Sequence, residues 1–208
     1  MTVRRVLLVT LACFAALALA AAVGGALPAD ALVREAMLAG ASAPVLAVMR
    51  VANAAGDYRL LVPGTLLLPI VFPRARARWW LWIALMLAAA VSPDLLKFIV
   101  GRARPEDASM GFPSGHATAA AAYFGSIIYL ASSLPPRARP IVRVAAVLVM
   151  LAVGVARVML RAHWPSDVLG GFTFGLALAS TAALIDSLGT TTQGATRLDA
   201  SGETSPPT

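Results

Sequence analysis

Long apolar runs alternate with short polar stretches along the first 188 residues of the chain. Four runs approach the length of about 20 residues that crosses a membrane as a helix. They cover residues 6–27, 79–100, 141–158 and 168–188. Two further apolar helices are expected over residues 114–134 and over residues 58–72, where two prolines interrupt the second. The pattern predicts an all-α fold, a bundle of six transmembrane helices.

Residues 28–57 mix apolar and polar positions and do not form a span of their own. Asp30 is placed to cap a short helix over residues 31–39, and a second apolar piece covers residues 44–51. Short helices with one polar side lie in the membrane interface. We therefore expect two short interfacial helices between the first and second spans.

The two ends of the chain have different characters. The run at residues 6–27 is longer than the apolar core of a signal peptide, which has about 7–15 residues, so a retained helix is preferred and cleavage stays open. From Gly189 onward the chain is rich in Thr, Ser, Gly and Pro, a composition typical of disorder. Residues 1–188 are expected to form one integral membrane domain, followed by a disordered tail at 189–208.

Composition supports a membrane protein and argues against a nucleic-acid partner. The 208 residues are 59% hydrophobic and 13% charged, whereas soluble domains carry about 25% charged residues. The net charge of +7 is spread in small groups between apolar runs, without the continuous basic face that tracks a phosphate backbone. Cys13 is the single cysteine, which excludes a disulfide framework and a thiolate metal cluster.

The arginines indicate the topology. Six spans bring one group of them to the same side, namely Arg4, Arg5, Arg74, Arg76, Arg78, Arg137, Arg139 and Arg143. The positive-inside rule makes this side, with both termini, cytoplasmic. The opposite, outer side then receives residues 28–57, 97–113 and 157–167.

The outer side also carries cations that this rule does not explain: Lys97, Arg102, Arg104, Arg157 and Arg161. A charge at the membrane centre costs about 2.5–3.5 kcal/mol on insertion scales, so these side chains must lie at the interface or line a wet cavity. Taken singly, each one is most simply a lipid-headgroup anchor. Their concentration on one face instead indicates an anion site.

Both histidines of the chain lie in the same layer, each beside a predicted helix start. His116 ends the stretch Pro113-Ser114-Gly115-His116, and His163 precedes Asp167 by four residues. The first turn of a helix presents free N–H groups and a positive dipole to an anion. A carboxylate on one imidazole nitrogen fixes the tautomer and frees the other nitrogen to react. Together these features predict covalent phosphoryl transfer, with one histidine attacking and the other protonating the leaving oxygen.

These residues resemble the three-part signature of the type 2 phosphatidic acid phosphatase superfamily, whose motifs the vanadium haloperoxidases share. The pattern Lys-x6-Arg-Pro matches Lys97 to Pro105, and Pro-Ser-Gly-His matches Pro113 to His116. The third pattern, Ser-Arg-x5-His-x3-Asp, matches Arg157, His163 and Asp167. Ala156 stands where the pattern has serine, which removes one supporting hydroxyl.

The resemblance implies a role for each matched residue. His163 attacks phosphorus, Asp167 orients it, and His116 donates a proton to the leaving group. The remaining residues are implied to bind the phosphoryl oxygens: Lys97, Arg104, Ser114, Gly115 and Arg157. The resemblance implies neither a metal nor another cofactor, and the acidic residues of the chain are too scattered to enclose a magnesium ion.

The resulting hypothesis is a membrane lipid phosphatase acting at the outer leaflet, in a bacterial plasma membrane. Its substrate would be a polyprenyl diphosphate, phosphatidylglycerol phosphate or phosphatidic acid, and its other contacts would be membrane lipids. The alternative is a transporter or binding protein that holds lipid phosphates without chemistry. A haloperoxidase is disfavoured because those enzymes are soluble and this composition is not.

Overall fold

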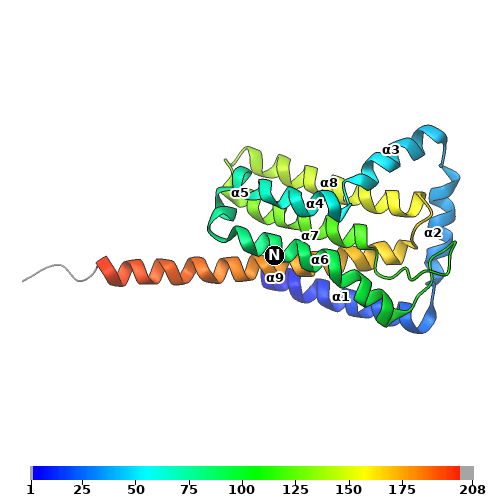
Figure 1. Cartoon of the computed structure of the whole chain (residues 1–208), viewed down its shortest axis with the longest axis horizontal. Coiled ribbons are helices and arrows are strands. Elements are labelled where there is room, and N and C mark those ends of the chain that lie inside the picture. Colours follow the sequence, from blue (N-terminus) through cyan, green and yellow to red (C-terminus); the bar gives the residue numbers. More distant parts are fainter. Residues whose placement is uncertain (1, 202–208) are drawn as a thin grey trace, which may run out of the picture.

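The computed structural model describes residues 2–201, and its regular structure is helical (Figure 1). In chain order the helices are α1 (Val3–Gly24), α2 (Pro28–Ala39), α3 (Ala43–Ala54), α4 (Tyr58–Gly64), α5 (Leu68–Val71), α6 (Trp79–Val100), α7 (Gly115–Leu130), α8 (Ala138–Met159) and α9 (Pro165–Ser201). The 3₁₀ segments are η1 (Thr65–Leu67), η2 (Pro73–Arg78) and η3 (Ala131–Ser133). The predicted all-α class is confirmed for the described residues, where Ala103 and Met110 form an isolated antiparallel bridge.

Among the described residues, four helical segments are long and apolar enough to cross a membrane. They cover 3–24, 73–100, 138–159 and 165–189. The pair α2 and α3 makes a fifth if it is counted as one span bent by 119°. Helix α7 has 16 residues, and the expected helix over 58–72 is divided into α4, η1 and α5, because its prolines disturb the helical hydrogen bonds. The count of six spans therefore stays a prediction.

The segment between α1 and α4 differs from expectation in one detail. Pro28 occupies the first turn of α2, so the helix begins before Asp30 rather than after it. The Asp30 carboxylate instead reaches back and accepts a hydrogen bond of 2.8 Å from the Leu27 N–H. Asp30 is consequently a buried side chain inside the first turn of α2.

Helix α9 is the longest element of the fold and extends far beyond the bundle (Figure 1). It continues to Ser201, past Gly189, where a disordered tail was predicted to begin. Residues 202–208 of that tail lie outside the described residues. For them the predicted disorder stays a prediction.

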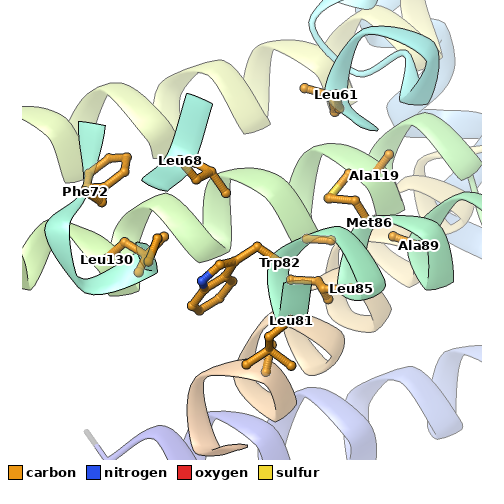
Figure 2. Packing of buried hydrophobic residues seen from close by; sticks show 13 residues of the cluster. Leu61, Leu68, Phe72, Leu81, Trp82, Leu85, Met86, Ala89, Ala119 and Leu130 are labelled. Atoms are coloured by element: carbon orange, nitrogen blue, oxygen red, sulfur yellow. The ribbon is translucent and has the colours of Figure 1, made fainter. Parts of the chain in front are cut away.

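A buried apolar cluster joins α6 to α7 and to the short helices α4 and α5. Figure 2 shows side chains from these helices gathered around Trp82, which is fully buried. Leu85 and Met86 of α6 and Leu130 of α7 belong to the same cluster. Burying a side chain of this size contributes about 1.5–3 kcal/mol. The cluster therefore fixes the relative position of two helices that each carry predicted site residues near their far ends.

The segments predicted to share the outer face do share one end of the bundle. Helix α2, the loop over residues 101–114 and the turn at residues 160–164 lie together at the same end (Figure 1). The Trp164 indole N–H donates to the Ala103 carbonyl at 3.3 Å, and the Ser166 amide donates to Asp30 Oδ1 at 2.8 Å. Residues far apart in the sequence are thus assembled into one layer.

Candidate active site

A small cavity of about 200 Å³ opens at this end of the bundle. Its walls come from α4, α6, α7 and α8, with the loop over 101–114 and the turn over 160–164. It is lined by Tyr58, Ala89, Ala90, Pro93, Asp94, Lys97, Arg104, Gly115, His116, Arg157 and His163. Both histidines and three of the unexplained cations therefore face one space, whose size suits a phosphate group.

His163 and Asp167 form a buried pair at the start of α9. Because Pro165 begins that helix, Asp167 falls in its first turn, and its Oδ2 lies 3.2 Å from His163 Nδ1. The same Oδ2 accepts a bond of 2.9 Å from the Trp164 N–H. An Nδ1–H donated to the carboxylate leaves Nε2 with its lone pair free. The contact is the one that the spacing of four residues predicted.

Burial lowers the pKa of the His163 imidazole, and the nearby Asp167 carboxylate opposes part of this shift. Desolvation disfavours the charged form of any buried histidine. A lowered pKa keeps the imidazole neutral at neutral pH, the form that a nucleophile requires.

The start of α7 is tied directly to the start of α9. Ser114 is the N-cap of α7, its Oγ accepts from the Ala117 N–H at 3.5 Å, and its own N–H donates to the Asp167 carbonyl at 3.0 Å. Ser114 is fully buried and does not line the cavity, so its predicted phosphate contact would have to come after a rearrangement. Gly115 does line the cavity, and a Cβ added there would lie 4.0 Å from Lys97 Nζ.

Lys97 and Arg104 both line the cavity, but they do not lie on one continuous helix. The helix that carries Lys97 does not persist to Arg104, because α6 ends at Val100 and Gly101 adopts a left-handed conformation (φ 69°). Glycine ends helices readily in this way. Arg104 returns to the cavity through the following loop, where its N–H donates to the Ser109 carbonyl at 2.9 Å.

Arg157 reaches the cavity from the last turn of α8. Its Nη1 donates to Asn53 Oδ1 at 2.6 Å, while its buried Nε has no hydrogen-bond partner among the residues that the structure describes. A buried donor without a partner costs free energy, and a phosphoryl oxygen would satisfy it. The neighbouring Ala156 is fully buried and does not line the cavity.

The sequence profile of the PAP2 superfamily matches residues 78–187, slightly more than half of the chain. This chain belongs to the PAP2 superfamily. The matched region includes all eight residues predicted to form the site. The geometry and the profile therefore identify the same part of the molecule.

Curated relatives of this PAP2 protein are lipid phosphatases. A lipid A 1-phosphatase of Rhizobium etli is 33% identical over 133 residues, which cover 54% of this chain and 54% of the relative. Phosphatidylglycerophosphatase B of Bacillus subtilis is 34% identical over 111 residues, covering 47% and 55%. Decaprenylphosphoryl-5-phosphoribose phosphatase of Mycobacterium tuberculosis is 31% identical over 130 residues, covering 58% and 66%. The chain spans about half the length of the first two.

A solved structure supports the fold over nearly the whole chain. The crystal structure of a transmembrane PAP2-type phosphatidylglycerolphosphate phosphatase from Bacillus subtilis superposes with a TM-score of 0.77 at 26% identity. The match covers 87% of this chain and 96% of the other. Together with its apolar helices, the match identifies this PAP2 protein as a multi-pass membrane protein.

Two polar residues that line the cavity, and one that contacts the cavity-lining Arg157, were not predicted as site residues. Asp94 lines the cavity, and its Oδ1 lies 2.7 Å from Lys97 Nζ. The spacing of three residues on a helix was a usable signal for that ion pair. Tyr58 and Asn53 come from the segment before α6, and no motif or spacing marked either of them.

Proposed function

We propose that this PAP2 protein hydrolyses a phosphomonoester or diphosphate of a membrane lipid through a phosphohistidine at His163. The proposal rests chiefly on one observation. A buried histidine–carboxylate pair opens on a cavity of about 200 Å³ that also holds Lys97, Arg104 and Arg157. Three cations around a neutral imidazole can hold a phosphoryl group in position for attack.

The proposed reaction has two steps. His163 Nε2 attacks phosphorus, the bond from phosphorus to the leaving oxygen breaks, and His116 gives its proton to that oxygen. Water then attacks the phosphohistidine, His116 takes a proton from the water, and the bond from nitrogen to phosphorus breaks to release phosphate. The cations Lys97, Arg104 and Arg157 offset the charge on the equatorial oxygens in both steps.

Lipid entry is proposed to occur from the side of the membrane. Val91 and Leu95 of α6, beside the cavity-lining Ala90 and Asp94, are 70% and 63% exposed, as expected for side chains facing lipid. The small cavity suits the phosphate, whereas the lipid chain would remain outside it. Polyprenyl diphosphate, phosphatidylglycerol phosphate and phosphatidic acid are the proposed substrate candidates, and lipid A phosphates join them through the relative in Rhizobium etli.

The proposed topology places this end of the bundle on the outer side of a bacterial plasma membrane, with both termini in the cytoplasm. It is supported by the arginines at the opposite polar segments, such as Arg74 and Arg76 before α6. The two short helices α2 and α3 are proposed to lie at the outer interface. Residues 1–188 would form the phosphatase domain, and 189–208 the cytoplasmic tail.

The test is phosphate release by the purified full chain in detergent, with EDTA present, from a panel of these lipid monophosphates and diphosphates. We expect release from at least one of them, and a phosphoenzyme that survives base but not acid. Binding of lipid phosphates without any release would instead support the alternative, a transporter or binding protein. Bromide oxidation after addition of vanadate would favour haloperoxidase chemistry.

The rate should depend on pH in a bell shape. Because the pKa of His163 is lowered by burial, its neutral form persists below the usual histidine pKa of about 6.5. The ascending limb of kcat/KM, which reports the free enzyme, is therefore expected below pH 6.5. At high pH kcat, which reports the enzyme–substrate complex, should fall as His116 loses a proton that the bound phosphoryl anion helps it to hold. A rate that stayed flat from pH 5 to 9 would contradict these two roles.

Replacing Asp94 with asparagine should lower KM. The Asp94 carboxylate pairs with Lys97, and the Asp94 side chain is 79% exposed, so a substrate phosphate must compete with Asp94 for the lysine. An exposed ion pair is worth up to about 1 kcal/mol, and we expect KM to fall by about two- to fivefold with kcat little changed. Glu106→Gln is the matched control, because Glu106 pairs with Arg34 and Arg161 outside the cavity. Equal KM values in Asp94→Asn and the unmodified enzyme would refute the competition.

A further inference from the structure

Arg102 is a buried cation beside the candidate site that does not line the cavity. Arg102 is 4% exposed. Its guanidinium contacts the Asp167 carboxylate oxygen that does not contact His163. Nη2 donates to Asp167 Oδ1, and Nη1 donates to Ser166 Oγ at 2.8 Å and to the Gly25 carbonyl at 3.2 Å. Nη1 also lies 3.4 Å from Asp30 Oδ2.

Asp30 completes this cluster from α2. Its Oδ1 accepts from the Ser166 N–H at 2.8 Å, and its Oδ2 accepts from the Ser166 Oγ–H at 2.5 Å. Asp30, Ser166 and Asp167 are all buried. The cluster therefore connects the segment between α1 and α2 to the first turn of α9, through a single guanidinium that bridges two carboxylates.

The two oxygens of Asp167 are divided between different partners. Oδ1 faces Arg102, while Oδ2 faces His163 Nδ1 and the Trp164 N–H. Nη2 of Arg102 holds Oδ1 while Nη1 is held by Ser166, Gly25 and Asp30, and a planar guanidinium can make both sets of contacts at once, which an ammonium group cannot. With Oδ1 held, the carboxylate cannot turn away from the imidazole, and part of its negative charge is neutralised.

We propose that Arg102, balanced by Asp30, is a positioning residue that sets both the orientation of the Asp167 carboxylate and the charge that this carboxylate presents to His163. The inference rests on the proposed function, since it assigns a second layer to the same site. Arg102 acts through Asp167 and does not touch the substrate. Asp30 weakens the effect of Arg102 on Asp167, because the two carboxylates share one guanidinium.

Charge predicts opposite effects for the two partners. Removing the Arg102 cation leaves Asp167 uncompensated, stabilises the imidazolium and should raise the pKa of His163. Removing the Asp30 anion leaves the Arg102 charge to be balanced by Asp167 alone, which should lower the pKa of His163. The other titratable or charged groups that act on His163 or face the same cavity remain unchanged in both variants: Arg104, Asp107, His116, Arg157, Lys97 and Asp94.

The experiment compares Arg102→Gln, Arg102→Lys and Asp30→Asn in the full chain in detergent. We expect the ascending limb of kcat/KM to move up by about 0.5–1 pH unit in Arg102→Gln and down by a similar amount in Asp30→Asn. Arg102→Lys keeps the charge but not the fork, so its limb should stay in place while kcat falls about tenfold. Arg161→Gln is the control, since it removes an exposed guanidinium two residues from His163 that pairs with Glu106.

A readout independent of turnover separates this inference from the proposed function. The pH dependence of His163 modification by diethyl pyrocarbonate, followed by mass spectrometry of the peptide, reports the same imidazole in an enzyme without activity. If the original chain releases no phosphate, but Arg102→Gln and Asp30→Asn shift the pH dependence of His163 modification in opposite directions, the phosphatase proposal is refuted and the positioning role is retained. Folding of each variant is checked by gel filtration and thermal unfolding.

Two results would overturn the positioning role. One is a folded Arg102→Gln whose pH limb and kcat equal those of the unmodified protein. The other applies where Arg102→Gln does not fold, because it leaves two carboxylates buried together. In that case an Asp30→Asn variant that folds and shows no downward shift rejects the inference by itself.

Discussion

His163→Ala is expected to lower phosphate release from lipid phosphates by about 10³-fold or more, while the protein stays folded. The imidazole is the attacking group in the proposed mechanism, and removal of a covalent nucleophile typically costs at least this factor. The side chain is buried, yet it borders a cavity, so its truncation enlarges an existing space. Steady-state release of inorganic phosphate from the best substrate of the panel measures the effect.

His116→Ala serves as the comparison for this variant. His116 lines the same cavity from the first turn of α7, but its proposed role is proton transfer. We expect His116→Ala to release phosphate slowly and still to accumulate an acid-labile phosphoryl group at residue 163. His163→Ala should carry no phosphoryl group. A phosphoryl group that persisted in His163→Ala would place the covalent step on another residue.

Gly175→Ala should destabilise the bundle and remove most of the activity. A Cβ at this position of α9 would lie 2.3 Å from the Thr118 carbonyl oxygen, 2.7 Å from Ala121 Cβ and 3.0 Å from the Ala122 nitrogen. Two of these atoms belong to the backbone of α7, which cannot turn aside as a side chain can. Small residues allow membrane helices to approach closely, and overpacking such a contact typically costs about 1–3 kcal/mol.

The loss of activity follows because α7 carries the site. Ser114 and His116 stand at its start, so a displaced α7 separates His116 from His163. Gly24→Ala is the matched control, since a Cβ there would meet no described atom within 4 Å. Thermal unfolding in detergent, followed by tryptophan fluorescence, is expected to show a lower midpoint for Gly175→Ala only. Equal midpoints for the two variants would show that α7 and α9 have room to separate.

Much of the site was predictable because local spacing controls local contacts. His163 and Asp167 are four residues apart at a helix start marked by Pro165, and that spacing alone brings their side chains together. The lengths of the apolar runs predicted α1, α6, α8 and α9 within a few residues at most ends. The family signature then indicated which cations join them, although it did not show how they meet.

The sequence by itself determined the apolar helices, the histidine–carboxylate pair and the identity of the three cations at the cavity. The tertiary structure decided which way the neighbouring cations point. Arg102 and Arg104 are two residues apart, yet Arg104 lines the cavity while Arg102 lies behind Asp167. Helical periodicity cannot predict this difference between Arg102 and Arg104, because Gly101 ends the helix before them. The loop that carries them is held by residues distant in the chain. The partnership of Asp30 with Ser166, 136 residues away, exists only once α2 packs across the end of the bundle.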